Sequence, residues 1–451
     1  MQQPADRSNS RPTPPGLAAR ELAHRLIAGV LIDRRPLERV LAEALEAPQA
    51  AAIEPRDRAF ARMLAATVLR RQGELEHVLG AFLKRPLPRS SGRVWPILLA
   101  GAAQLLCLGT PPHAAVGLAV EATRREKGGT PFANLANAVL RRVAAEGNGL
   151  LVGQDATRLN IPAWLWRRWC DTYGDADARR IAEASLKEPA LDISLKPGAD
   201  AQTWADRLGG RLLPTGSVRL AAHGRIEDLP GYGEGAWWVQ GAAAALVVRA
   251  AGDIAGRTVA DLCAAPGGKT ASLAAGGAHV TAVDVSEPRL GRLRENLRRL
   301  DLAAEVIAAD VTRWAPGRTF DAVVLDAPCT ATGTISRHPD ILRLKQPADV
   351  GRMAELQRAM LDRAANLVRL GGVLVYATCS LEPEEGRAQA DAFLEREPAF
   401  RRAPIAAQEI GADPAWIAAG DLRTLPFHLN LEAAEQGGLD GFYVARLRRH
   451  A

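Results

Sequence analysis

Two cysteines in the second half of the chain, Cys329 and Cys379, follow short apolar runs typical of buried strands. A thiol just past the end of a strand can be stabilised as a thiolate by nearby backbone N–H groups. A single cysteine is more often a small buried apolar residue, and this interpretation suits Cys107 and Cys170, which lie in apolar helical segments. The two strand-end cysteines are candidates for nucleophilic chemistry, because neighbouring strands would let both face one cleft.

A glycine-containing loop, LCAAPGGKT at residues 262–270, follows an earlier apolar run and leads into a helical segment. Its glycines, Gly267 and Gly268, let the backbone approach a ligand, and the N–H groups of the following helix favour an anionic group. It is not a Walker A loop, since Cys263 stands where that motif needs a glycine, and its adjacent glycines exclude G-x-G-x-x-G. On its own the loop could be a tight strand-to-helix turn.

Three aspartates, Asp284, Asp310 and Asp326, stand at the ends of the next three predicted strands. A lone aspartate in such a place is usually a helix cap or a turn former, but carboxylates at the ends of successive strands suit the hydroxyl groups of a ribose. No second cradle for an anionic group accompanies them. This combination indicates a nucleoside ligand without phosphates, such as S-adenosylmethionine.

Two thiols beside a methyl donor suggest methylation of carbon 5 of a cytosine, which is too weak a nucleophile to react unaided. A thiolate that adds to carbon 6 makes carbon 5 nucleophilic, and a second group must then assist loss of the carbon 5 proton and of the thiol. Asp326 could hydrogen-bond the ring nitrogen and the amino group, and the base must be unstacked to be reached. Chemistry alone leaves open which of Cys329 and Cys379 is the nucleophile.

These residues need a parallel sheet to bring them to one edge, and residues 241–451 alternate strand and helix as such a sheet requires. The predicted strands are Val259–Cys263, Val280–Val285, Glu305–Ala308, Phe320–Leu325, Val373–Thr378 and Phe442–Leu447, and helices are predicted over 286–300, 350–369 and 383–396. The pattern predicts a doubly wound, mostly parallel sheet with its ligands at the carboxyl ends of the strands.

The first part of the chain has a different pattern. Residues 17–145 repeat apolar residues at helical spacing and predict a small all-helical domain. Within it, the uncharged run Ile97–Gly109 is too short to span a bilayer and is expected to be a buried helix. Residues 147–165 suggest a connector, Ile161–Ala184 one or two helices, and residues 190–240 a small α+β subdomain.

Positive charge is concentrated at the front of the chain. Of 451 residues, the first 150 carry 21 lysines and arginines against 13 aspartates and glutamates, and the remainder carry 36 against 38. A basic front part suggests a polyanionic partner such as RNA or DNA, although a solubilising surface explains the charge equally well. Five widely spaced cysteines, without a CxxC pair or a cysteine–histidine cluster, indicate reduced thiols in a cytoplasmic protein and no metal site.

Four motifs resemble those of the RNA cytosine-5 methyltransferases of the NOL/NOP/Sun type: DLCAAPGGKT at 261–270, DAPCTATGT at 326–334, RHPDI at 337–341 and YATCS at 376–380. Two more, PPHAAV at 111–116 and NAVLRR at 137–142, resemble the NusB-like RNA-binding domain at the front of one bacterial branch, the RsmB type, which modifies 16S ribosomal RNA. The resemblance spans roughly residues 20–450.

A multidomain chain is therefore expected. Its parts would be a disordered, proline-rich tail (1–16), an all-α NusB-like domain (17–146), linker helices with a small α+β subdomain (147–235), and an α/β Rossmann-like class I methyltransferase domain (236–451).

The resemblance implies a role for each matching residue. Cys379 would be the nucleophile on carbon 6, Cys329 would assist product release, and Asp326 would contact the target cytosine. S-adenosylmethionine would be held by Cys263, Ala264, Ala265, Pro266, Gly267, Gly268 and Lys269, with Asp284 on the ribose, Asp310 near the adenine, and Arg289 and Asp326 lining the site. The family often has an acidic residue where this chain has Gly241, so no contact is carried over to that position.

These observations favour an S-adenosylmethionine-dependent enzyme that methylates a cytosine of 16S ribosomal RNA, either as naked RNA or in an early small-subunit particle. Two alternatives stay open. One is a transfer RNA substrate, and the other is a non-catalytic NusB-like scaffold whose methyltransferase half is inactive. The enzyme is expected to act as a monomer in the cytoplasm, without a metal and away from membranes.

Overall fold

The computed structural model of the protein divides the chain into two compact units. It describes residues 14–47, 53–220, 224–429 and 438–450. Residues 1–163 together with 338–344 form one unit, and residues 164–337 together with 345–451 form the other. The tail predicted at residues 1–16 lies outside the described residues except for its last three.

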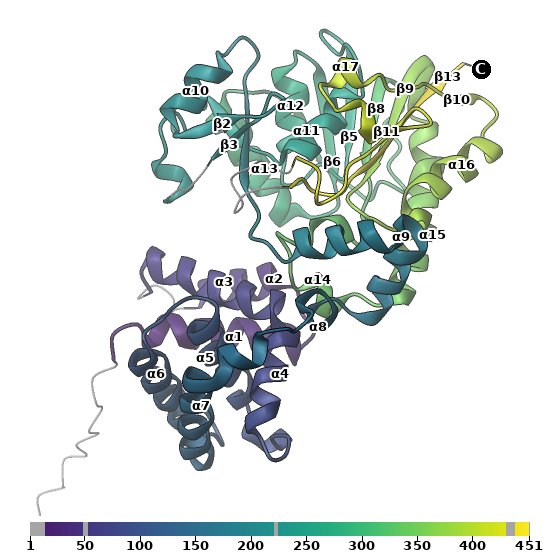
Figure 1. The fold of residues 1–451 in the computed structure, drawn as a ribbon. Coiled ribbons are helices and arrows are strands. Elements are labelled where there is room, and N and C mark those ends of the chain that lie inside the picture. Colours follow the sequence, from purple (N-terminus) through teal and green to yellow (C-terminus); the bar gives the residue numbers. More distant parts are fainter. Residues whose placement is uncertain (1–13, 48–52, 221–223, 430–437, 451) are drawn as a thin grey trace, which may run out of the picture. The chain divides into compact units, whose positions relative to one another are not determined.

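The first unit is helical, as its sequence predicts (Figure 1). Its helices are α1 (Leu17–Leu31), α2 (Leu37–Glu46), α3 (Pro55–Arg70), α4 (Gln72–Phe82), α5 (Val94–Leu106), α6 (Pro112–Arg125), α7 (Ala133–Leu151), α8 (Ala156–Asn160) and α14 (Ile341–Leu344). Helix α5 contains the uncharged apolar run up to Leu106, and it packs against α1, α3, α4, α6 and α7. None of the helices in the described ranges is long and apolar enough to cross a membrane.

The helical unit extends beyond the residues expected for it. Helix α7 continues to Leu151 and α8 follows, so most of the expected connector belongs to this unit. Asn160 of α8 accepts a hydrogen bond from the backbone N–H of Glu74 in α4 at 3.2 Å. The segment His338–Leu344 also belongs here, because Asp340 accepts from the backbone N–H of Leu37 at 3.0 Å. Sequence order alone does not predict that the chain returns to this unit.

The second unit begins with α9 (Ala163–Ser185), which is bent where Gly174 adopts φ 78° and ψ 162°. A small antiparallel sheet with the strand order β2-β3-β1-β4 follows, where a small α+β subdomain was expected. Its elements are β1 (Leu191–Leu195), α10 (Ala201–Arg207), β2 (Gly210–Leu212), β3 (Val218–Leu220) and β4 (Trp237–Val239). Buried Arg219 and Asp192 form an ion pair of 2.7 Å within this sheet, and Asp192 also accepts from the N–H of Ala242.

The large sheet of the second unit confirms the strand–helix alternation predicted from the sequence. Its strands are β5 (Thr258–Leu262), β6 (His279–Asp284), β7 (Glu305–Ala308), β8 (Phe320–Asp326), β9 (Val368–Thr378), β10 (Phe400–Arg402), β11 (Ile417–Ala418), β12 (Asp421–Arg423) and β13 (Tyr443–Arg449). The strand order is β11-β12-β13-β9-β8-β5-β6-β7, and β10 pairs with β13. Strands β5 to β9 are mutually parallel, whereas β13 runs antiparallel to β9.

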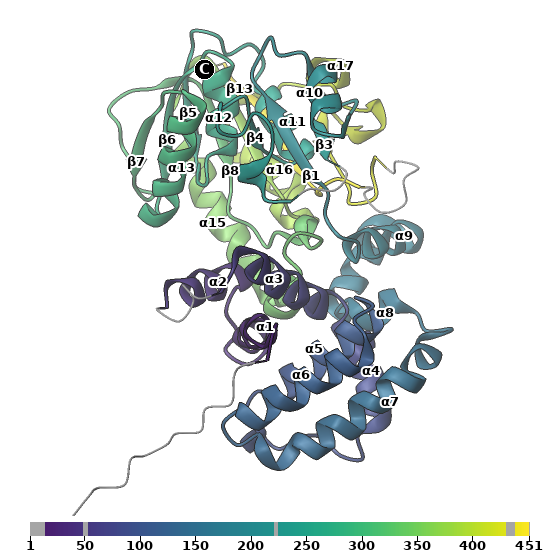
Figure 2. The same cartoon turned by 90° about the vertical axis from the view of Figure 1, so that its left-hand side faces the viewer.

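Helices cover both faces of this sheet, because its central strands are apolar on both sides. Val259 of β5 packs in a cluster with α11 (Ala242–Arg249) and α12 (Gly268–Ala275), whereas its neighbour Ala260 packs in a cluster with α15 (Pro347–Ala365) and α16 (Arg387–Arg396). Helix α13 (Glu287–Leu300) packs near the edge formed by β6 and β7 (Figure 2). The carboxyl ends of β5 to β9 therefore share one edge of a doubly wound sheet.

A close approach of α4 to α8 gives a test of the helical unit. A Cβ atom on Gly73 would lie 1.8 Å from the carbonyl oxygen of Leu159, whereas one on Gly80 of the same helix would meet nothing within 4 Å. We expect Gly73→Ala to destabilise the unit by about 1–3 kcal/mol through overpacking. Gly80→Ala is the matched control and should be neutral or stabilising by up to about 1 kcal/mol. Thermal unfolding followed by circular dichroism measures both, and equal melting temperatures for the two variants would contradict the α4–α8 packing.

Candidate active site

The glycine-containing loop joins β5 to α12 in a backbone conformation that its sequence makes possible. Cys263 has φ 62°, the Ala265–Pro266 peptide bond is cis, and Gly267 has φ 105°. A Cβ atom on Gly267 would lie 2.8 Å from the Leu293 side chain of α13, so both backbone angle and space require glycine here. The loop thereby presents its backbone at the carboxyl edge of the sheet.

Asp284 and Arg289 brace this loop. The carboxylate of Asp284, at the end of β6, accepts hydrogen bonds from the N–H groups of Ala265 at 3.1 Å and of Ser286 at 2.9 Å. The Arg289 guanidinium donates to the carbonyl oxygen of Ala265 and lies 3.9 Å from Asp284. Both side chains therefore contact the backbone of the glycine-containing loop.

Asp310 follows β7 by two residues and lies at the same edge, but its carboxylate is exposed. Its Oδ1 accepts hydrogen bonds from the side-chain hydroxyl of Thr312 at 2.7 Å and from its backbone N–H at 2.9 Å, and these bonds lower the pKa of Asp310. The side chain therefore stabilises its own turn while remaining open to solvent.

Lys269 links the glycine-containing loop to the end of β8. Its Nζ lies 2.6 Å from Asp326 Oδ2 and 5.5 Å from the ring centroid of Phe442. Burial opposes a charge on Lys269, but Asp326, together with smaller contributions from groups that include Asp261, raises the pKa of the lysine overall. A thiolate at Cys379 would raise the pKa of Lys269 further, so the ammonium group stabilises that thiolate in return.

The structure brings the two strand-end cysteines together. Cys329 Sγ and Cys379 Sγ are 3.4 Å apart, within hydrogen-bonding distance for sulfur. The N–H of Ala327 donates to the carbonyl oxygen of Ala377 at 2.9 Å, and the N–H of Gly333 donates to that of Cys379 at 2.9 Å. These bonds extend the β8–β9 pairing into both loops and hold the thiols on the same side of the sheet edge.

Two thiols near this edge are hard to ionise. The hydrogen bond with Cys379 and burial raise the pKa of Cys329 well above its usual range. Burial, together with Asp326, Asp284 and Asp261, raises the pKa of Cys263. Both therefore keep their protons, and either sulfur can donate the hydrogen bond between Cys329 and Cys379.

Asp261 and Gln240 are two residues of the site that the sequence did not single out. Asp261 is buried in β5, and its Oδ2 accepts from Thr270 at 2.6 Å while its Oδ1 has no hydrogen-bond partner in the described part of the chain. Gln240 donates to the carbonyl oxygen of Gly268 at 3.3 Å. A carboxylate in an otherwise apolar buried strand was the available signal for Asp261. Beside Gln240, a Cβ atom on Gly241 would lie 2.8 Å from Asp440, so another acidic side chain already occupies that space.

Rossmann-like methyltransferases have an open sheet whose last long strand is reversed, and a glycine-containing loop follows the strand at the centre of that sheet. Comparison with protein families shows to which family of this class the chain belongs. Residues 253–448 match the family described as 16S rRNA methyltransferase RsmB/F, and residues 17–145 match the NusB family.

Relatives of known name cover almost the whole chain. The Ribosomal RNA small subunit methyltransferase B of Vibrio cholerae is 37% identical over 91% of this chain and 93% of its own length. The protein of the same name from Xylella fastidiosa is 36% identical over 96% of this chain and 98% of its own. The chain belongs to this family of methyltransferases.

Solved structures share the fold. A crystal structure of a protein designated PH0851 is 22% identical, covers 97% of this chain and 99% of its own, and superposes with a TM-score of 0.72. A methyltransferase homologue from Pyrococcus horikoshii is 26% identical, covers 66% of this chain and 97% of its own, and superposes with a TM-score of 0.51.

The unpaired carboxylate oxygen of Asp261 gives a prediction about pH. Burial raises the pKa of Asp261 to about 7, whereas in the unfolded chain it is about 3.9. Between these values the folded protein holds a proton that the unfolded chain has released, so stability falls as pH rises through this window. We expect Asp261→Asn to remove that penalty, so that its melting temperature gains on the parent protein at pH 8 but not at pH 4. The corresponding gain in the free energy of unfolding is at most about 4 kcal/mol. A difference in melting temperature between Asp261→Asn and the parent that is the same at pH 4 and pH 8 would contradict the assignment.

Proposed function

We propose that this protein transfers a methyl group from S-adenosylmethionine to carbon 5 of a cytosine in 16S ribosomal RNA. The observation that carries the proposal is the pair of thiols 3.4 Å apart, beside the Lys269–Asp326 ion pair at the carboxyl edge of the sheet. The names of the relatives, which describe small-subunit ribosomal RNA methyltransferases, support the choice of RNA.

The residues around the glycine-containing loop fit S-adenosylmethionine, which supplies an electrophilic methyl group when bound. The loop from Cys263 to Lys269 would hold its methionine part, and the unpaired Oδ1 of Asp261 offers an acceptor beside that loop. Asp284 would bind the ribose with the lone pairs that its two backbone bonds leave free, because a carboxylate accepts about four hydrogen bonds. Exposed Asp310 would lie near the adenine, and Arg289 would line the site.

Cys379 would act as the nucleophile. The proton on Cys329 and the ammonium group of Lys269 both stabilise a thiolate at Cys379 before it attacks carbon 6 of the base. Asp326 has 26% of its side chain exposed, enough to contact the ring nitrogen and amino group of an unstacked cytosine. After methyl transfer, the carbon 5 proton leaves to a base and the carbon–sulfur bond breaks, which regenerates carbon 5–carbon 6 unsaturation. Cys329 would assist this release by donating to the departing sulfur.

The difference between the two thiols is testable by substitution. We expect Cys379→Ala to lower methyl transfer to below about one-thousandth of the parent rate, because the covalent step is lost. Cys329→Ala should instead accumulate a covalent protein–RNA adduct. This adduct survives denaturing electrophoresis as a slower-migrating band, and nuclease digestion removes that band. Cys107→Ala, in the helical unit, is the matched control. Full activity of Cys379→Ala, or adducts formed by it and not by Cys329→Ala, would overturn the assignment.

The target RNA can be identified without purified substrate. In a strain that lacks the gene, bisulfite sequencing of ribosomal and transfer RNA should find one 16S cytosine that has lost its methyl group. The parent gene should restore it and the Cys379→Ala gene should not. If a transfer RNA loses a methyl group instead, transfer RNA is the substrate and 16S ribosomal RNA is not. Unchanged RNA together with no binding of S-adenosylmethionine by calorimetry would favour the non-catalytic scaffold.

A further inference from the structure

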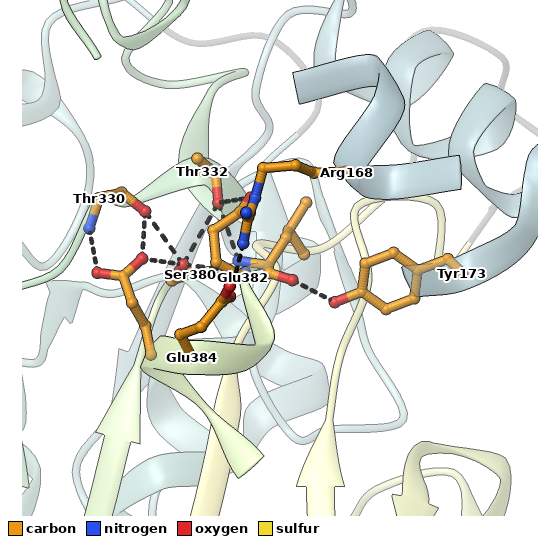
Figure 3. Close-up of polar contacts among 9 residues, drawn as sticks. Arg168, Tyr173, Thr330, Thr332, Ser380, Glu382 and Glu384 are labelled. Carbon is orange, nitrogen blue, oxygen red and sulfur yellow. Dashed lines mark hydrogen bonds and ion pairs between the residues drawn. The ribbon is translucent and has the colours of Figure 1, made fainter. Parts of the chain in front are cut away.

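A buried carboxyl group lies between the loops that carry the two thiols. Glu385 ends the short 3₁₀ helix η6 (Pro383–Glu385) and has no exposed surface. Its Oε1 accepts a hydrogen bond from the backbone N–H of Thr330 at 2.8 Å. Its Oε2 accepts from the hydroxyl groups of Thr330 and Ser380, which face each other at 3.1 Å (Figure 3). Thr330 and Ser380 each directly follow one of the two cysteines, so a single carboxyl group joins both loops.

Gln357 of α15 completes this arrangement. Its Nε2 donates to Glu385 Oε1 at 3.1 Å and to the carbonyl oxygen of Pro328 at 2.9 Å. The carbonyl oxygen of Glu385 in turn accepts from the hydroxyl of Thr378 at 3.0 Å. Pro328 and Thr378 directly precede the two cysteines. The residues on both sides of both thiols are therefore bonded to Glu385 or to Gln357.

The hydrogen-bonding capacity of Glu385 is fully used by these neighbours. A carboxylate offers about four acceptor sites, and four donors reach this one. No ion pair to Glu385 occurs within the residues that the structure describes, and burial raises its pKa although the bonds from Ser380 and Thr330 oppose this. Burying such a group costs free energy that an apolar side chain would not. A role in positioning the two loops explains why a carboxyl group occupies this place.

Side chains of helix α9 contact the chain between Cys379 and Glu385 (Figure 3). Arg168 forms an ion pair with the carboxylate of buried Glu382, and this pair carries the contact because the second partner of Arg168, Glu384, is half-exposed and its pair contributes little. The hydroxyl of Tyr173 donates to the carbonyl oxygen of Leu381 at 2.6 Å. The chain between Cys379 and Glu385 is thus held by a helix on one side and can transmit the position of Glu385 to the thiol.

We propose that Glu385 is a positioning residue that sets the separation of the Cys329 and Cys379 thiols. The proposal rests on the proposed function for what the thiols do, but the separation itself can be measured without RNA or a methyl donor. Glu385→Gln should preserve it, because the amide oxygen can accept from the two N–H donors while the amide nitrogen donates to the two hydroxyl groups. Glu385→Ala leaves these buried donors unpaired and lets the loops separate.

Phenylarsine oxide measures whether two thiols are close together. Its arsenic(III) centre forms two As–S bonds with a pair of thiols and releases one water molecule, whereas a single thiol binds it weakly. In the full-length protein, we expect Glu385→Ala to lower the affinity for this reagent at least about tenfold, or about 1.4 kcal/mol. Glu385→Gln should keep the parent affinity. Cys329→Ala, which retains the other four cysteines, sets the background.

Glu384→Ala is the matched control, because it removes the carboxylate next to Glu385 in η6. The Glu384 side chain is half-exposed and pairs with Arg168, and a surface ion pair of this kind contributes little. Its arsenical affinity should equal that of the parent. Ser380→Ala removes only the bond on the Cys379 side, should lower the affinity by a few-fold, and decides the matter if Glu385→Ala does not fold. Parent affinity in the folded Glu385→Ala protein, or in Ser380→Ala when that variant decides, would overturn the proposal.

Methyl transfer gives a second readout. Glu385→Ala should lower kcat while leaving the KM for S-adenosylmethionine unchanged, because the glycine-containing loop is held by other residues, and Glu385→Gln should restore kcat. An unchanged kcat with a raised KM would overturn the positioning role. If the parent protein itself transfers no methyl group, the proposed function fails while the arsenical measurement still decides the role of Glu385.

Discussion

The parallel pairing of β8 with β9 is the constraint on which the site depends. The register sets Asp326 opposite Ala377, and β8 ends three residues before Cys329 while β9 ends one residue before Cys379. Because side chains alternate between the two faces of a strand, a slip of one residue would send Asp326 and the thiol-bearing loops to different sides. The Ala327–Ala377 hydrogen bond continues this register past the end of β8. Thiol proximity is thus a consequence of sheet register first and of side-chain contacts second.

Carboxylates surround the thiols, and the structure satisfies each one differently. Asp284 accepts from backbone N–H groups, Asp326 pairs with Lys269, and Glu385 binds hydroxyl and amide donors. Asp261 retains one oxygen without a partner among the described residues. Negative charge of this kind keeps nearby thiols protonated, which suits Cys329. In the proposed reaction, Lys269 and a proton on Cys329 would have to offset this negative charge at Cys379.

The elements that sequence predicts best are those with buried apolar runs. The strand Glu305–Ala308 was predicted with its observed ends, β5 and β6 differ from their predictions by one residue at each end, and β8 differs by one residue at its end. Strand β9 begins five residues before the prediction, because Val368 pairs with Phe320 ahead of an irregularity that contains Gly371 at φ 75°, and regular pairing resumes at Val373. Helix α15 begins three residues before its prediction, at Pro347, where a capping box between Gln346 and Asp349 defines the first turn. Local pattern identifies such elements, and tertiary pairing decides where they end.

The residues of the site also differ in whether local sequence pattern or tertiary structure reveals them. Cys329, Cys379 and Lys269 stand in motifs whose residue types already indicate chemistry. Glu385 looks from the sequence like one more charge in the predicted helix over 383–396, since nothing local indicates that Thr330, 55 residues earlier in the chain, will help Ser380 to bury it. A buried polar group is recognisable only by its partners, and these come from separate loops.

The RHPDI motif illustrates how tertiary structure can divide a single motif. Arg337 pairs with Asp440 at 2.9 Å within the second unit, whereas Asp340, three residues later, accepts from the first N–H group of α2 in the helical unit. The free N–H groups of a helix start favour a carboxylate, so Asp340 stabilises the start of α2. Because the loop after Cys329 runs directly into this motif, the chain passes between the two units at 163–164, 337–338 and 344–345. Three covalent connections therefore join the two units where sequence order alone predicts one, and the connection at 337–338 follows Cys329 by eight residues.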